Sequence, residues 1–369
     1  MRVLVFGITD NPGGVEAVIM NYYRHVDNKR IQFDFLCNTK IVAYEDEIRE
    51  LGGNIYRIPM RSKNMTAYKT QLRHFFDSHI GVYDAIWVNV CSLANIDYLK
   101  EARRIGIPTR IIHSHNSRNM DSWVRGILHR LNKQRIKKYA TQFWACSQEA
   151  GKWFFPNSIL KGKDYHIIHN AIDIRKYEFN LKIRDRVREQ QNWSKKFVIG
   201  NIGRLHFQKN QSFLLEAFSK VIKVHPQSIL VLVGDGEDKN ELQKKASTLG
   251  ISDSVFFLGL RSDIPALLQG FDVFVFPSVF EGLPLAVIEA EAASLPVIAS
   301  QGAIPPEVNM SDNFSFLPLE SGSDVWAKKI LEFINSARIK QDLSGIIESG
   351  FDIESEINKL STLLEMKNE

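Results

Sequence analysis

Short apolar runs alternate with longer segments of helical periodicity along the first half of the chain. The runs are rich in β-branched residues, which is typical of buried parallel strands. They lie at Val3–Phe6, Phe33–Cys37, Ile55–Ile58, Ala85–Val90, Thr109–His113 and Phe143–Cys146. A segment of helix length follows each run, such as the one that starts at Val15 and the one around Tyr44–Leu51. Strands that alternate with helices predict a parallel sheet with helical crossovers.

The same alternation restarts after a polar, charge-dense stretch, Asn180–Lys196. Strands are expected in the second half at Phe197–Ile202, Ile229–Val233, Val255–Leu258, Val273–Phe276 and Val297–Ala299. The helical patterns between them include Asn210–His225, Asp238–Leu249 and Pro284–Ala293. The chain ends in an amphipathic helical pattern, Phe351–Met366. The economical interpretation is an α/β protein with two doubly wound domains joined near residue 190.

Composition narrows the class of protein. With 369 residues, of which 44% are hydrophobic and 24% charged, the chain can bury a large core, which excludes a disulfide miniprotein and a disordered tail. The longest apolar run, Leu283–Ala299, contains Glu289 and Glu291, so no membrane span is expected. The first residues pass from one Arg directly into a strand pattern and a Gly-rich turn, unlike a signal peptide. We therefore expect a cytoplasmic protein whose three cysteines are reduced.

The net charge of +5 is unevenly distributed. Residues 1–178 hold 27 Lys and Arg against 17 Asp and Glu, a net +10, whereas the remaining residues hold 20 against 25, a net −5. A basic first half suits an anionic partner, such as a phosphorylated substrate, an anionic membrane surface or nucleic acid.

Two loops of the second half are candidate ligand sites, because open α/β sheets bind ligands at the carboxyl ends of their strands. The segment Gly203–Asn210 follows a strand and precedes a helix, and its cations Arg204 and Lys209 suit a diphosphate. The alternative is a solvated loop with two ordinary surface cations. The segment Gly234–Glu237 places two glycines around an acid in a tight turn, a pattern found in many connections between strands and helices.

A more specific pattern follows the expected strand Val273–Phe276. Pro284 is expected at the first position of a helix, so Glu281 precedes the helix and Glu289 lies inside it. Carboxylates on both sides of a helix N-terminus could hold sugar hydroxyls while the helix dipole holds a phosphate. The alternative for Glu289 is a solvent-facing position, but its neighbours are apolar or small, and an unpaired carboxylate on a buried helix is costly.

Two motifs of the first half are further candidates for ligand contact. Gly13 and Gly14 follow the first strand and permit close backbone approach, although their spacing is not that of a dinucleotide fingerprint. His113 and His115 stand at the end of another strand. No Cys, His or carboxylate cluster around them has metal-ligand spacing, so no metal site is expected. The alternative for either histidine is a hydrogen-bonded polar residue at a strand end.

The segment 122–138 is basic and contains no acid. Four apolar residues recur in it at helical spacing: Val124, Ile127, Leu128 and Leu131. We expect this stripe to pack on the protein's own sheet. The opposite face, with Trp123 at one end, suits anionic lipid headgroups or a lipid diphosphate, and its cations are Arg125, Arg130, Lys133, Arg135, Lys137 and Lys138. The alternative is a solvated charged helix, and no nucleic-acid partner is expected because no groove-reading motif accompanies the charge.

These motifs resemble those of retaining glycosyltransferases of the GT-B fold, the large fourth family (group 1). The resemblance rests on the Glu281-x7-Glu289 spacing, the Gly203–Asn210 loop and the Gly234–Glu237 turn, and it spans essentially the whole chain. It implies two Rossmann-like doubly wound domains that face a cleft. Residues 1–185 would form the acceptor-binding domain together with a returning C-terminal helix at 351–369, and residues 190–350 would form the nucleotide-sugar domain.

The resemblance also assigns roles to residues. Arg204 and Lys209 would bind the donor's diphosphate, Glu281 would contact the donor sugar, and Glu289 would hold the ribose hydroxyls. Other donor contacts are expected at Gly13, Gly14, Gly203, Gly234, Leu260, Gly282, Leu283, Pro284 and Leu285.

Two further positions are less sharply assigned by the resemblance. The family commonly carries a cleft histidine near the donor sugar, and either His113 or His115 fits; we prefer His115 because it lies farther beyond the strand. Ala303 stands where many relatives have a second glycine, which leaves the ligand role of its loop open.

The implied function is hexosyl transfer with retention, from a nucleotide-diphosphate sugar to a hydroxyl of a lipid-diphosphate-linked glycan in capsular or exopolysaccharide synthesis. UDP is the expected nucleotide, and the protein is expected in the cytoplasm, in peripheral contact with the inner face of the membrane. No metal or other cofactor is expected, because two cations and a helix dipole can stabilise a leaving diphosphate. The alternatives are a nucleotide-sugar epimerase on the same fold and a non-catalytic sugar-nucleotide or membrane-binding protein.

Overall fold

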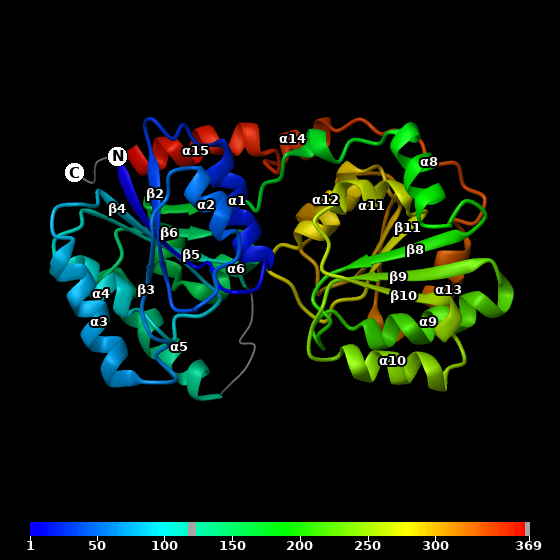
Figure 1. Cartoon of the computed structure of the whole chain (residues 1–369), viewed down its shortest axis with the longest axis horizontal. Coiled ribbons are helices and arrows are strands. Elements are labelled where there is room, and N and C mark those ends of the chain that lie inside the picture. Colours follow the sequence, from blue (N-terminus) through cyan, green and yellow to red (C-terminus); the bar gives the residue numbers. More distant parts are fainter. Residues whose placement is uncertain (117–122, 366–369) are drawn as a thin grey trace. The chain divides into compact units, whose positions relative to one another are not determined.

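The computed structural model describes residues 1–116 and 123–365. They form two compact units (Figure 1): Met1–Ala171 with the segment from Ile353 onward, and Ile172–Asp352. Ser122 and the part of the expected C-terminal helix beyond Glu365 lie outside the described residues. In the part of the chain that the structure describes, no helix is both long and apolar enough to cross a membrane.

The first unit is built on a parallel sheet of seven strands in the order β3-β2-β1-β4-β5-β6-β7. The strands are β1 (Arg2–Phe6), β2 (Gln32–Cys37), β3 (Ile55–Arg57), β4 (Ala85–Val90), β5 (Thr109–Ser114), β6 (Gln142–Ala145) and β7 (Tyr165–Ile167). Six of them were expected from the apolar runs. The edge strand β7 was missed because its three residues are only half-buried and carry no apolar run.

Helices cover both faces of this sheet, with α1 and α15 on one side and α3, α4 and α5 on the other (Figure 1). The helices of this unit are α1 (Gly14–His25), α2 (Glu45–Glu50), α3 (Met65–Ser78), α4 (Asp97–Arg104), α5 (Trp123–Arg135), α6 (Gln148–Phe154), α7 (Asn157–Leu160) and α15 (Ile353–Glu365). The C-terminal helix α15 is tied to the sheet, since Gln142 Nε2 donates to the Leu363 carbonyl at 3.2 Å. Burial of one apolar side of each helix against the sheet stabilises the unit.

The second unit contains a parallel sheet of six strands in the order β10-β9-β8-β11-β12-β13. The strands are β8 (Phe197–Ile202), β9 (Ser228–Val233), β10 (Val255–Gly259), β11 (Val273–Phe276), β12 (Val297–Ser300) and β13 (Phe314–Leu317). The edge strand β13 was not expected, because three of its four residues are only half-buried and no long apolar run marks it.

Helices α9, α10 and α13 lie on one side of this sheet, and α8, α11 and α12 lie on the other (Figure 1). The helices are α8 (Leu181–Gln190), α9 (Gln211–Val224), α10 (Lys239–Thr248), α11 (Ile264–Gly270), α12 (Leu285–Ala292), α13 (Gly322–Leu331) and α14 (Ser344–Glu348). A continuous core of buried aliphatic and aromatic side chains, from Phe197 to Ile330, joins α9 and α13 to the sheet.

The two compact units divide between Ala171 and Ile172, earlier in the chain than the domain limit expected near residues 185–190. The charge-dense stretch that suggested a linker contains α8, and its cations are structural. Arg184 Nη1 donates to the Phe271 carbonyl at 2.6 Å, and Arg188 Nη1 pairs with Asp272 at 3.1 Å. These guanidinium groups donate to backbone carbonyls at the end of α11 and fix α8 to the second unit.

Candidate functional site

The carboxyl-terminal edge of the second sheet brings the second-half motifs together. Chain order reverses between the neighbouring strands β8 and β11, and ligands of open α/β sheets bind at such a switch point. The loop that follows β8 carries Arg204 and Lys209, and the loop that follows β11 carries Glu281. Strand order alone therefore places these two loops side by side.

Glycines allow the loops after β8 and β9 to lie against each other. A Cβ added at Gly234, whose φ is +130°, would lie 2.2 Å from the Gly203 carbonyl oxygen, a distance that no side chain tolerates. The Gly203 amide donates to the Val233 carbonyl at 2.9 Å, and the Leu205 amide donates to the Asp235 carbonyl at 3.0 Å. Gly234 thus has a structural reason to be glycine, independent of any ligand.

Lys209 and Glu281 form a close ion pair at this edge. Lys209 Nζ lies 2.6 Å from Glu281 Oε1 and 4.8 Å from the centre of the Phe276 ring. Glu281 is 7% exposed, and Gln208 Nε2 donates to its second carboxylate oxygen at 3.3 Å. The site therefore contains a desolvated carboxylate with defined orientation, held by a cation from the neighbouring loop.

Arg204 pairs with a different carboxylate. Its Nη2 lies 3.0 Å from Glu237 Oε2, and His206 Nε2 lies 3.3 Å from Glu237 Oε1. The side chain of Arg204 is 55% exposed. A backbone hydrogen bond and these neighbours, Arg204 before His206, lower the pKa of Glu237. Sequence reasoning treated Glu237 only as part of a turn; the structure makes it the partner of the cation assigned to a diphosphate.

The loop before α12 is buried, and its helix begins one residue later than expected. Pro284 is the N-cap residue, in extended conformation, and the helix starts at Leu285. The expectation that Pro284 occupies the first helical position is therefore wrong; its carbonyl accepts the first helical hydrogen bond, from the Val287 amide at 3.1 Å. Gly282 and Leu283, the other residues of this loop, are buried beside Glu281.

Glu289 lies in α12 and receives a hydrogen bond from outside the motif. Tyr177 Oη donates to Glu289 Oε1 at 2.9 Å. Burial raises the pKa of the Glu289 carboxyl to about 7, and the tyrosine hydroxyl opposes that rise. Glu289 is thus not an ordinary solvent-facing carboxylate. No pattern in the sequence pointed to Tyr177, which is separated from Glu289 by 112 positions.

Two other loops complete this edge of the sheet. Gly259, with φ +67°, ends the edge strand β10 and its carbonyl accepts the Gly234 amide at 2.8 Å; Leu260 follows and is largely exposed. In the loop after β12 the Ala303 carbonyl accepts the Glu281 amide at 2.9 Å. The loop with the alanine in place of a glycine therefore has a structural role, which is to hold the backbone of Glu281.

The first unit holds the other candidates, at the carboxyl ends of its own strands. Gly13 is the N-cap of α1, and its amide donates to the Asn11 carbonyl at 2.7 Å. Glu16 is buried nearby and accepts a hydrogen bond from Thr9 Oγ1 at 2.5 Å. A Cβ added at Gly14 would meet no atom within 4 Å, so Gly14 is not required by packing within this unit.

His113 and His115 are both buried, and their ring centroids are 4.1 Å apart. Trp87 Nε1 donates to His113 Nδ1 at 3.3 Å, whereas His115 Nε2 lies 2.9 Å from Asn89 Oδ1. Burial lowers the pKa of His115 to about 4 and also lowers the pKa of His113. Both imidazoles are therefore neutral at physiological pH, which suits hydrogen bonding to hydroxyl groups better than pairing with a phosphate.

Helix α5 leaves most of its apolar stripe exposed, although the stripe was expected to pack on the sheet. Trp123 is 76% exposed and Leu131 is 53% exposed, and two other apolar residues of the helix, Val124 and Ile127, are exposed with them. Two polar residues of the helix pack inward instead: His129 Nδ1 accepts the Leu93 amide at 3.1 Å, and Lys133 Nζ donates to the Trp153 carbonyl at 2.6 Å. The expectation that the apolar stripe packs on the sheet is wrong, because the hydrogen bonds of His129 and Lys133 to the backbone of the first unit fix a different side of the helix inward.

No group of three or more His, Cys, Asp or Glu side chains placed to hold a metal ion occurs within residues 1–116 and 123–365.

Comparison with solved structures identifies the architecture. The chain superposes on HepE of Anabaena in complex with UDP and glucose with a TM-score of 0.80, over 99% of this chain and 100% of that one, at 20% sequence identity. A sucrose-phosphate synthase from Thermosynechococcus elongatus gives a TM-score of 0.74 over 98% of each chain at 16% identity. The two Rossmann-like units define the GT-B class of fold, which confirms the predicted fold class.

Sequence comparison gives the family. The model of glycosyl transferases group 1 matches residues 183–346. "Putative glycosyltransferase EpsF" of Bacillus subtilis is 30% identical over 371 residues, which cover 97% of this chain and 95% of that protein. An Escherichia coli UDP-Gal:alpha-D-GlcNAc-diphosphoundecaprenol alpha-1,3-galactosyltransferase is 32% identical over 213 residues, 53% of each chain. The chain belongs to the group 1 glycosyltransferases, and the prediction of a glycosyltransferase is confirmed.

Proposed function

We propose that the protein transfers a hexose with retention, from a UDP-sugar to a hydroxyl of a lipid-diphosphate-linked glycan, in the synthesis of a surface polysaccharide. The observation that carries the proposal is the Lys209–Glu281 pair at the switch point of the second sheet, with Glu289 on the adjoining helix. The names of similar proteins support the donor and acceptor classes: HepE was solved with UDP and glucose, and the Escherichia coli relative is named for a diphosphoundecaprenol-linked acceptor.

The chemistry requires stabilisation of a leaving diphosphate. Negative charge grows on the diphosphate as the bond to the anomeric carbon breaks, and preorganised cations and amides that face it lower the barrier. Arg204 would exchange Glu237 for a phosphate oxygen, and Lys209 would share its charge between Glu281 and the diphosphate. We propose that no metal ion is needed, because these cations and the N-terminus of α12 would supply the charge.

The remaining groups would orient the two substrates. Glu281 would hold hydroxyls of the transferred sugar, and Glu289 would hold the ribose. The first unit would contribute His115, Gly13 and Gly14, as the resemblance implies. Retention would result from attack of the acceptor hydroxyl on the face that the diphosphate leaves.

A lipid-linked acceptor calls for contact with a membrane, and we propose that α5 makes it. The exposed apolar residues Trp123, Ile127 and Leu131 would enter the headgroup region, and the exposed cations Arg130 and Lys137 would lie beside anionic lipids. An amphipathic helix with Trp on its apolar side and Lys or Arg beside it is typical of interfacial binding.

A panel of UDP-, GDP- and ADP-sugars tests the donor assignment, scored by thermal stabilisation and by release of the nucleotide. We expect stabilisation by UDP-sugars, because a ligand that binds only the folded state raises the unfolding temperature. Stabilisation by none of the three classes at millimolar concentration would refute the proposed donor. NMR of the product tests the stereochemistry, and an inverted anomeric centre would refute retention.

A further inference from the structure

Tyr177 links the start of the second unit to the carboxylate of Glu289. It follows directly after a short 3-10 helix, Ile174–Lys176, close behind the point where the chain enters the second unit at Ile172. Its hydroxyl donates to Glu289 Oε1 at 2.9 Å. Tyr177 and Glu289 are far apart in the sequence. They meet because the 3-10 helix packs against α12.

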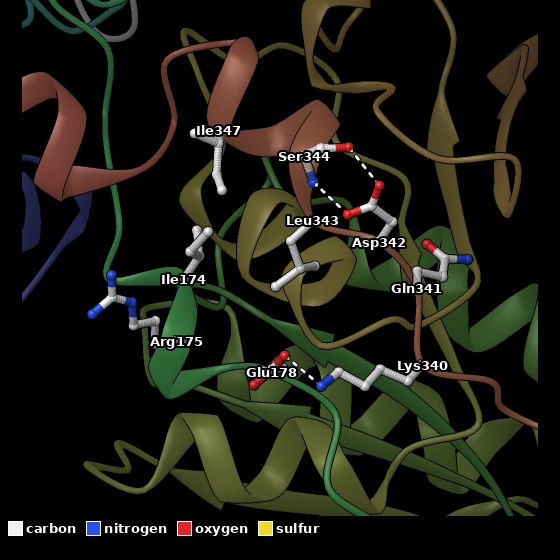
Figure 2. A pocket seen from close by; sticks show the side chains of 9 residues that line it. All are labelled: Ile174, Arg175, Glu178, Lys340, Gln341, Asp342, Leu343, Ser344 and Ile347. Atoms are coloured by element: carbon white, nitrogen blue, oxygen red, sulfur yellow. Dashed lines mark hydrogen bonds and ion pairs between the residues drawn. The ribbon is translucent and has the colours of Figure 1, made fainter.

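The backbone of Tyr177 is held by Gln269. Gln269 is 1% exposed; its Nε2 donates to the Tyr177 carbonyl at 2.9 Å, and its Oε1 accepts the Asn180 amide at 3.0 Å. The next residue, Glu178, forms an exposed ion pair with Lys340 at 2.5 Å at the wall of an open cavity of about 540 Å³ (Figure 2). The tyrosine hydroxyl is therefore presented to Glu289 from a fixed main chain, which is the condition for orienting a partner group.

The two oxygens of the Glu289 carboxylate have different surroundings. Oε1 accepts from Tyr177, while no hydrogen bond to Oε2 occurs within the described part of the chain. A carboxylate oxygen that accepts no hydrogen bond from the protein can accept one from a ligand. Glu289 lies in α12, the helix that follows the Glu281 loop of the proposed donor site. A pair of vicinal hydroxyls, such as those of a ribose, can supply a donor to Oε2.

We propose that Tyr177 is a positioning residue for donor binding: its hydroxyl fixes Glu289 Oε1 so that the carboxylate faces the ribose hydroxyls of the nucleotide. This inference rests on the proposed function. Tyr177 does not touch the reacting atoms, so its contribution belongs to the affinity for the nucleotide and not to the chemical step.

The test compares Tyr177→Phe with the wild-type protein by calorimetric titration with UDP and by steady-state kinetics with the UDP-sugar. The substitution removes one hydroxyl and keeps the ring, so the fold is expected to persist. A hydrogen bond to a charged acceptor typically contributes enough to change affinity about tenfold. We expect the Kd for UDP and the KM for the donor to rise about tenfold, with kcat within about twofold of wild type.

A second readout separates positioning from general loosening of the fold. In the Glu289→Gln background, Tyr177→Phe is expected to change the Kd for UDP by less than about twofold, since the group it orients is already altered. The pH midpoint of UDP binding is expected to move to higher pH in Tyr177→Phe, because the donor that favours the ionised carboxylate is gone. Tyr177 is the titratable group that faces Glu289; Glu291 on the same helix is bonded to Ser311 and the Met310 amide instead.

The matched control is Tyr23→Phe, which removes a buried hydroxyl that donates to the Leu51 carbonyl at 3.0 Å in the first unit. It is expected to leave UDP binding unchanged. The inference would be overturned, with the proposed function intact, if Tyr177→Phe bound UDP with wild-type affinity. It would also be overturned if Tyr177→Phe weakened UDP binding equally with Glu289 and with Gln at position 289. Failure of the wild-type protein to bind UDP, GDP or ADP would overturn the proposed function, and the inference with it.

Discussion

Lys209 and Glu281 are 72 positions apart in the chain, yet Lys209 Nζ lies 2.6 Å from Glu281 Oε1. The two loops that carry them follow strands β8 and β11, which are adjacent because chain order reverses between them. In the proposed donor site, the pair would couple a sugar-binding carboxylate to a diphosphate-binding cation, and we expect it also to contribute to the stability of the second unit.

Lys209→Met is expected to destabilise the protein by about 2–3 kcal/mol, because Glu281 would remain buried with its cation removed. Urea unfolding followed by circular dichroism measures the change. The double substitution Lys209→Met with Glu281→Gln should recover part of the loss, since it removes the uncompensated charge. If Lys209→Met left the free energy of unfolding unchanged, solvent would have free access to Glu281.

Arg204→Gln is expected to change stability by less than about 1 kcal/mol, because its ion pair with Glu237 is exposed. The same substitution should weaken binding of UDP about tenfold while leaving uridine binding unchanged, since only UDP presents phosphate oxygens. Titration with the two ligands measures the difference.

The control for Arg204 is Glu237→Gln, which removes the carboxylate that holds Arg204 in the absence of ligand. It should leave UDP affinity at the wild-type level or above it. Equal weakening of UDP and uridine in Arg204→Gln would contradict a contact with the diphosphate.

Glu291 should make stability depend on pH. Burial raises the pKa of this carboxyl to about 8, from an ordinary value of 4.5, against hydrogen bonds from Ser311 and the Met310 amide. The folded state therefore binds a proton that the unfolded state has lost, and this stabilisation falls as pH rises from about 4.5 to about 8. Glu291→Gln is expected to raise the free energy of unfolding relative to wild type by about 1–3 kcal/mol at pH 8.5, and by less at pH 5. Thermal unfolding of both proteins at the two pH values measures this effect. A stability difference between Glu291→Gln and wild type that does not change with pH would contradict the prediction.

Membrane binding by α5 should depend on its apolar residues as well as its charge. Trp123→Ser with Leu131→Ser is expected to weaken binding to vesicles of anionic phospholipid more than tenfold, since each side chain loses about 1.5–3 kcal/mol of burial. Charge reversal at Arg130 and Lys137 should weaken binding strongly at low salt and less at high salt.

Lys133 is omitted from this charge reversal because it is bonded to the fold. Val224→Ser, on the exposed surface of the second unit, is the control. Sedimentation with vesicles measures the bound fraction. If the apolar substitutions left vesicle binding unchanged, the contact with the membrane would be purely electrostatic, and the proposed insertion of α5 would be wrong.

Much of the fold could be predicted from the sequence, because buried parallel strands need uninterrupted apolar runs. The ranges expected for β4, β8 and β11 are those observed. The edge strands β7 and β13 are short and only half-buried, so they left no such run. The stretch that contains α8 was predicted to be the junction between the domains because it is rich in charge. Its arginines bind backbone carbonyls and Asp272, and composition alone cannot distinguish such arginines from solvated ones.

By itself, the sequence determined the alternation of strands and helices, the two doubly wound domains and the positions of Arg204, Lys209, Glu281 and Glu289, since each depends on local periodicity or on spacing within one loop or helix. Only the tertiary structure decided which charges meet, that His129 and Lys133 of α5 face inward, and that Tyr177 donates to Glu289. Those relationships depend on contacts between distant segments, and strand order and packing set them rather than any property of neighbouring residues.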